Sequence, residues 1–240
     1  QPVARWVDPV CVRTIGVPDE VASRVEHRVR EIAKAARVRL AKPRCTPNLT
    51  IAFTDSAGKV ARWVGQRSQT AFENITHAER EQLYRGAAPI RWWHTVEMRS
   101  SDGMRSMGND VPPAARLDGI GSVALGGQVI QQYRPSFLRT QVVRALTSAS
   151  VVIDVKLAQG KLLDSVADYA ALVGLAEIRP ADSPPAASIL SLFSDRGPAA
   201  LTALDSIFLR TLYRLPLDRT ALAQRGLLVR GLTNPAAKDD

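Results

Sequence analysis

The chain has 240 residues, of which 45% are hydrophobic, which is enough for one substantial core. Because it contains no apolar run of about 18 residues, we expect no transmembrane segment. The formal charge of +9 comes from 32 basic and 23 acidic residues, and the arginines are scattered along the chain. This spread favours a solvated basic surface over a dedicated polyanion-binding face.

The N-terminal part of the chain predicts a strand, a long helix and a second strand. Residues 10–15 alternate in polarity, as a half-buried strand does, and Pro18-Asp19-Glu20 is a typical helix start. The helix that follows has one apolar face, made of Val21, Val25, Val29, Ile32, Ala33 and Ala36. Residues 49–53 are apolar or β-branched and predict the second strand.

The next segment predicts two short helices and a third strand. Residues 59–66 are compatible with a short helix. Thr76 and Glu79 have the spacing of a capping box, which opens a helix that Gly86 ends. Residues 90–98 are the third strand candidate.

The centre of the chain predicts a long loop over residues 99–122, which are rich in Gly, Ser, Asp and Pro. Residues 122–130 predict a strand, and residues 137–146 a strand or a short helix. Residues 151–155 form a strong β run, and residues 162–178 predict a helix.

The C-terminal part begins with a proline-rich break at 180–185 and a short apolar turn or strand at 188–193. Thr202-Ala203-Leu204-Asp205 caps a further helix, and a last helix is expected over 218–230. We find no internal repeat and no linker, so we expect one domain over residues 1–235 and a frayed tail over 236–240.

The two cysteines, Cys11 and Cys45, flank the first predicted helix. The chain starts at Gln1, without an initiator Met, which favours a mature exported chain after removal of a secretory peptide, although a trimmed chain would look the same. In an exported protein two cysteines favour a disulfide. The alternative is a pair of buried, reduced thiols.

The stretch Val166-Ala167-Asp168-Tyr169-Ala170-Ala171-Leu172-Val173-Gly174-Leu175 has the spacing of the zinc-protease motif His-Glu-x-x-His-x-x-Gly-x-x-His. Asp168 falls at the Glu position and Gly174 at the Gly position. In this frame the chain resembles the metzincin family over residues 150–214. Residues 151–155 are placed like the edge strand before the active-site helix, and Ser188-Ile189-Leu190 like the Met-turn. The ending also resembles that of a family of secreted bacterial proteins with an eroded zinc motif.

The three histidine positions of this frame hold Ala167, Ala171 and Glu177. An alanine methyl group cannot bind zinc, and Asp168 would have no metal-bound water to activate. The resemblance therefore implies the scaffold and argues against zinc catalysis, so we expect no metal and no cofactor. The alternative is an ordinary amphipathic helix that matches the motif by chance.

Four acidic residues are binding candidates: Asp154, Asp164, Asp168 and Glu177. Asp164 and Asp168 are four residues apart on one helix and could bind a hard cation together with Glu177. A solvated acidic edge is the plainer interpretation. The histidines at 27, 77 and 94 lie on separate elements and make a poor metal site, and the chain has no Gly-x-Ser-x-Gly elbow and no P-loop.

Trp92 and Trp93, beside Arg91, are the best recognition patch in the sequence. In a strand they point to opposite faces, so one could be exposed and stack on a ligand, although both could be structural. Aromatic residues make up only 5% of the chain and do not alternate with basic ones, so we expect no nucleic acid as a partner.

Together these features predict an α+β, zincin-like fold, with a mixed twisted sheet packed on a long N-terminal helix and a central helix, and with C-terminal helices. The predicted function is that of a periplasmic or secreted non-catalytic protein, which binds a peptide, a protein or an anionic envelope component beside the strand 151–155. The alternatives are a hydrolase with a non-histidine metal or carboxylate site and a basic polyanion-binding module. The sequence leaves the oligomeric state open.

Overall fold

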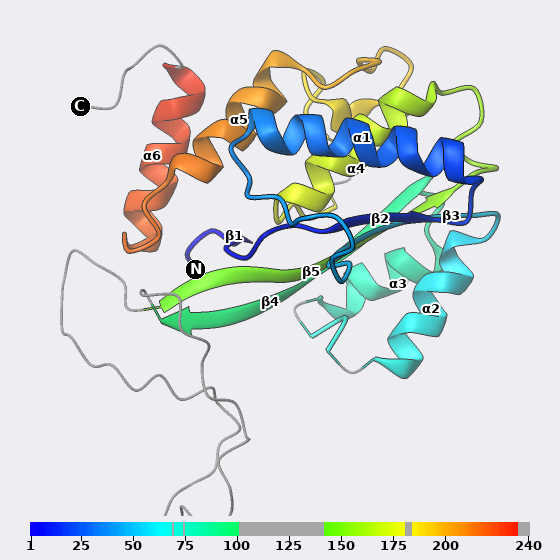
Figure 1. The fold of residues 1–240 in the computed structure, drawn as a ribbon, viewed down its shortest axis with the longest axis horizontal. Coiled ribbons are helices and arrows are strands. Elements are labelled where there is room, and N and C mark those ends of the chain that lie inside the picture. Colours follow the sequence, from blue (N-terminus) through cyan, green and yellow to red (C-terminus); the bar gives the residue numbers. More distant parts are fainter. Residues whose placement is uncertain (69, 74, 101–141, 181–183, 235–240) are drawn as a thin grey trace, which may run out of the picture.

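The computed structural model describes residues 1–68, 70–73, 75–100, 142–180 and 184–234. These residues form a mixed β-sheet with helices on both faces, in agreement with the predicted α+β composition (Figure 1). Most of the predicted loop 99–122, the strand 122–130 and the tail 236–240 lie outside the described residues. None of the helices described is long and apolar enough to cross a bilayer.

β5 (Val142–Asp154) is the central strand of the sheet. It pairs in parallel with β1 (Arg5–Trp6) and β3 (Leu49–Thr54), and β3 pairs in parallel with β2 (Val12–Ile15). Its other edge pairs antiparallel with β4 (Ile90–Ser100), with a register shift between Thr95 and Val96. β5 is therefore held on both sides, and β4 is an edge strand of the described sheet.

The prediction that residues 151–155 form an edge strand is wrong, because most of them belong to this central strand. Val151, Val152 and Ile153 are at most 2% exposed, since helices cover both faces of the sheet here. A continuous apolar run, without polar alternation, is typical of a strand buried on both faces. β5 consequently has no free edge in this region with which a peptide could pair.

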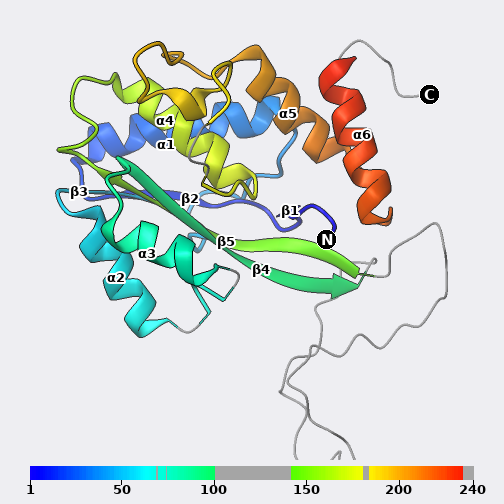
Figure 2. The same cartoon turned by 180° about the vertical axis from the view of Figure 1, so that it is seen from behind.

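The helices divide between the two faces of the sheet (Figures 1 and 2). One face carries α1 (Asp19–Ala35), α4 (Leu163–Leu175) and α5 (Ala203–Arg214), and the other carries α2 (Ala57–Arg67) and α3 (His77–Arg85). A 3-10 turn, η2 (Ile189–Ser191), contacts α4. α6 (Ala221–Thr233) packs on α5, close to the N-terminus.

α4 is the central helix of the first face, and every residue from Ser165 to Leu175 is buried. The expectation of an amphipathic helix is therefore wrong for this stretch, because neighbouring segments cover the helix on all sides from Ser165 onward. Gly174 lies where α4 approaches β3, and a Cβ at this position would come within 2.7 Å of Leu49 Cδ1. Glycine at 174 thus permits a close helix–sheet contact.

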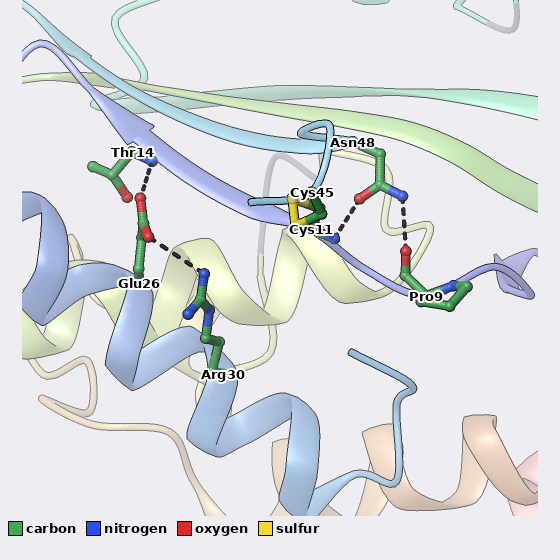
Figure 3. Close-up of a disulfide and its surroundings, with 7 residues drawn as sticks. All are labelled: Pro9, Cys11, Thr14, Glu26, Arg30, Cys45 and Asn48. Carbon is green, nitrogen blue, oxygen red and sulfur yellow. Dashed lines mark hydrogen bonds and ion pairs between the residues drawn. A yellow bond between two sulfur atoms is a disulfide. The ribbon is translucent and has the colours of Figure 1, made fainter. Parts of the chain in front are cut away.

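Cys11 and Cys45 form the predicted disulfide, with an S–S distance of 2.02 Å (Figure 3). Asn48 binds the backbone just before β2: its Oδ1 accepts from the Cys11 N–H at 2.7 Å, and its Nδ2 donates to the Pro9 carbonyl at 3.1 Å. The covalent loop between the cysteines contains β2 and α1. This loop ties the long N-terminal helix to the sheet at both of its ends.

We expect opposite effects from replacing two helical glycines by alanine. Gly174→Ala lowers the free energy of unfolding by about 1–3 kcal/mol, because Leu49 is fully buried and has no room to move. Gly226→Ala on α6 raises it by about 0.5–1 kcal/mol, because a Cβ there meets open space and alanine favours the helix. Urea denaturation of both variants measures the two changes, and equal shifts would contradict this account.

Candidate functional site

The acidic residues of α4 pair with arginines on the neighbouring helix α1. Asp164 accepts from Nε and Nη2 of Arg24 at 2.9 and 2.8 Å, and Asp168 accepts from Nε and Nη2 of Arg28 at 2.6 and 3.1 Å. The two arginines are four residues apart on α1 and the two aspartates are four residues apart on α4, so the two ion pairs lie one helical turn from each other. The hydrogen bond with Arg24 lowers the pKa of Asp164, and the hydrogen bond with Asp168 raises the pKa of Arg28.

The two carboxylates differ in burial and therefore in role. The Asp164 side chain is 50% exposed, whereas that of Asp168 is 1% exposed. Asp168 also accepts a hydrogen bond from the Leu201 N–H at 2.7 Å, just before α5. Asp168, at the Glu position of the metzincin frame, thus joins α4 to α1 and to the approach to α5.

The alanines in the histidine positions of that frame face the core. Ala167 is 1% exposed and Ala171 is 0% exposed, and both belong to the main hydrophobic cluster. Glu177, in the third position, pairs bidentately with Arg144 at 2.6 and 2.7 Å. In the described part of the chain, no group of three His, Cys, Asp or Glu side chains could hold a metal ion.

Asp154 caps backbone groups at the end of β5. It accepts from the N–H groups of Ala57 at 3.1 Å, Lys156 at 3.2 Å and Leu157 at 3.3 Å. It therefore fixes the start of α2 and the turn after β5. The four acidic candidates have separate partners, so the structure does not bring them together in one cleft.

Trp92 and Trp93 point to opposite faces of the sheet, as predicted, but neither is an exposed recognition residue. Trp92 is 7% exposed and packs in the core on the α4 side, and Trp93 is 5% exposed and packs in the cluster under α2 and α3. Trp92 Nε1 also donates to the Ile178 carbonyl at 2.7 Å. The predicted patch fails because helices cover both faces of β4.

His94 lies on the same side of β4 as Trp92, at the C-terminal end of α4. Its Nε2 is 2.7 Å from the Val173 carbonyl oxygen, one of the last carbonyls of the helix. Burial lowers the pKa of His94, and the Val173 hydrogen bond and the Glu177 charge offset this only in part. His94 is thus a buried, neutral donor to the helix end.

A cavity of about 320 Å³ lies beside Trp92, and its walls are mainly apolar. Tyr169 from α4 meets Trp92 edge-on with ring centroids 5.8 Å apart, and the centroid of the Phe193 ring lies 6.0 Å from that of Tyr169. We call this space the Tyr169 cavity, after the residue that contacts both of the other rings. Burial raises the pKa of Tyr169, and no described residue forms a hydrogen bond with its hydroxyl group.

Charged residues stand at the wall of the Tyr169 cavity. Arg179 Nη1 lies 3.2 Å from Glu79 Oε1, and both residues line the cavity. Burial acts to raise the pKa of Glu79, but its hydrogen bonds with Thr76 and the charge of Arg179 outweigh this and lower it. Arg91 donates to the carbonyl groups of Gly86 and Ala88 and so braces the loop on that side.

Sequence reasoning missed this cavity, although two of its residues carried a signal. Tyr169 is the one aromatic residue in the helix, and Phe193 ends the apolar segment 188–193. Only the packing of β4, α4 and η2 brings them to Trp92. No protein-family model, no curated protein and no solved structure matches the chain.

We expect Asp168→Asn to destabilise the protein far more than Asp164→Asn. The buried amide would lose the ion pair with Arg28 and could place an N–H group against the Leu201 N–H, at a cost of about 3 kcal/mol. The Asp164 pair is solvent-exposed, so its loss should hardly move the urea midpoint. Similar midpoints for the two variants would show that Asp168 does not join the helices.

The stability of the protein should fall below about pH 6.5 because of His94. The folded state disfavours the imidazolium form, so the unfolded chain takes up the proton first. As the pH falls, the free energy of unfolding therefore decreases by at most about 1.4 kcal/mol per pH unit, until the pH reaches the lowered pKa of His94 in the folded protein. His94→Gln should flatten this slope, whereas His27→Gln, on the exposed side of α1, should leave it. Parallel pH profiles for wild type and His94→Gln would contradict the assignment.

Proposed function

We propose that this chain is an exported, non-catalytic binding protein on a zincin-like scaffold, and that the Tyr169 cavity holds an apolar group of its ligand. The observation that carries the proposal is the cavity itself. Three aromatic rings from three segments surround about 320 Å³, and the central ring has a hydroxyl group without a partner among the described residues. Apolar walls with a few polar groups are typical of ligand sites.

The order of elements supports the zincin-like part of the proposal. The central strand β5 leads into α4, an antiparallel edge strand lies beside β5, and η2 contacts α4 where the resemblance expects a Met-turn. Thr202 and Asp205 form a capping box at the start of α5, the helix that the resemblance expects to close the domain. This arrangement places the Tyr169 cavity between the edge strand, the central helix and η2.

The contents of α4 support a binding role over catalysis. Two of the three positions that would carry zinc ligands hold core alanines, and the third holds Glu177, which is paired with Arg144. The position of the general base holds a carboxylate that is already paired with Arg28. A base engaged in a buried ion pair is poorly placed to accept a proton from water. The Cys11–Cys45 disulfide is compatible with export to an oxidising compartment.

The cavity favours an apolar side chain of a peptide or protein as the ligand. Its volume is that of a small pocket, which fits one or two side chains better than a large cofactor. Glu79, Gln82 and Arg179 line it too and could bind the polar backbone that flanks such a side chain.

A dye-binding experiment tests the cavity. 1-Anilinonaphthalene-8-sulfonate, an apolar probe with one negative charge, should bind the native protein and gain emission. Ala88→Trp should weaken this binding at least about tenfold, because a Trp side chain at the cavity wall occupies the space of the probe. The Ala88 carbonyl that Arg91 uses is kept.

Ala78→Trp on α3 is the matched control, because Ala78 is exposed and does not line the cavity. Equal dye binding by both variants would place the probe elsewhere and overturn the cavity assignment. Metal analysis and a peptidase assay of the native protein test the non-catalytic part separately. Stoichiometric zinc together with peptidase activity would overturn that part.

A further inference from the structure

The outer face of α2 is a basic surface around an exposed tryptophan. Lys59, Arg62, Trp63, Gln66 and Arg67 are all exposed, and their spacing puts them on one side of the helix. Ala57 and Ala61 lie on the opposite side and are buried. We call the exposed set the α2 face.

The charges of the α2 face are not neutralised within the described protein. α2 contains no acidic residue, and Lys59, Arg62 and Arg67 form no ion pair with any described residue. The arginines instead lie over aromatic rings: Arg67 Cζ is 4.6 Å from the centre of the Trp63 ring, and Arg62 Cζ is 5.9 Å from that of Tyr84. On α1, by contrast, Arg24, Arg28 and Arg30 all pair with acids.

Trp63 differs from the other three tryptophans of the chain in its exposure. Its exposed fraction is 56%, whereas Trp6, Trp92 and Trp93 are at most 7% exposed. An exposed indole in the middle of a basic helix face has the composition of a membrane-surface contact, where the ring sits at the headgroup level and cations bind anionic lipids.

The inner side of α2 keeps this face pointed outward. A Cβ at Gly58 would lie 2.6 Å from the Tyr84 carbonyl oxygen, and one at Gly65 would lie 2.1 Å from the Tyr84 hydroxyl oxygen. The helix therefore packs on α3 at a distance that only glycine allows. Both views show α2 on the side of the sheet opposite α1 and α4 (Figures 1 and 2).

We propose that the α2 face binds an anionic phospholipid surface. The uncompensated positive charge selects a negatively charged partner, and the single exposed indole on a helix surface suits a flat interface. A single-stranded nucleic acid would need a groove and a series of aromatic rings, and the α2 face offers one exposed ring. The α2 face shares no residue with the Tyr169 cavity, so the two proposals stand independently.

Vesicle binding with the full chain tests the proposal. The protein should sediment with vesicles of equal parts phosphatidylglycerol and phosphatidylcholine at millimolar lipid, and not with phosphatidylcholine alone. Binding should be lost in about 0.5 M NaCl, because salt screens exposed charges. Brominated lipid chains should quench tryptophan emission, and the quenching reports on Trp63 because the other three tryptophans are buried.

Two pairs of variants separate the α2 face from net charge. Arg62→Gln/Arg67→Gln should weaken vesicle binding about 25-fold, at about fivefold for each charge. Arg225→Gln/Arg230→Gln removes the same charge from exposed positions on α6 and should change binding by less than about threefold. Trp63→Ala should abolish the bromine quenching, and Leu222→Ala, at another exposed apolar position, should leave it.

Three results would overturn the proposal. One is the absence of binding to phosphatidylglycerol vesicles, and another is an equal loss in the two arginine double variants. The third is that the protein does not bind vesicles but binds a single-stranded oligonucleotide, and that Trp63→Ala weakens this binding. All six substitutions are at exposed positions, so circular dichroism should show unchanged folding.

Discussion

A carboxylate inside the helical layer constrains how the helices of that face fit together. Asp168 is almost fully buried, and it needs donors from outside its own helix. Arg28 supplies two from α1 and the Leu201 N–H supplies one from the approach to α5. Three segments distant in sequence are thus fixed around one side chain, and a shift of any of them would leave a buried charge short of hydrogen bonds.

The second constraint is the absence of bulk along α4. Ala167, Ala170 and Ala171 let neighbouring segments come close, and Gly174 does the same against Leu49. Between these small residues, the ring of Tyr169 reaches Trp92 on β4. The helix is buried from Ser165 to Leu175, and Tyr169 lines the Tyr169 cavity. The proposed site lies where a bulky ring interrupts that packing.

Local sequence patterns predicted the individual helices and strands better than they predicted which of these elements lie side by side. The capping boxes at Thr76 and Thr202 and the disulfide between Cys11 and Cys45 were confirmed, because each depends on short-range chemistry or on the only pairing available. The edge-strand prediction for residues 151–155 was wrong, since strand order depends on pairing between distant segments. The metzincin frame stays a prediction, because no comparison tests it.

The candidate site was the least predictable part of the molecule. The acidic residues in α4 gave no sign in the sequence that arginines 140 positions away would pair with them. Trp92 likewise gave no sign of which helix would cover it. Cavities arise from the mismatch between packed surfaces, and a mismatch has no local sequence pattern. Tyr169 could be singled out from its helix, but its neighbours could not.

The central position of β5 also bears on how the chain acquires its structure. β5 comes after β1, β2, β3 and β4 in the sequence, yet it is the strand that joins β1, β3 and β4. Until it is in place, the N-terminal strands have an open hydrogen-bonding edge, which is a site for unwanted pairing. Contacts of this kind between distant residues slow folding. We therefore expect the N-terminal strands to stay unfolded, or to be protected from pairing with other chains, until β5 is available.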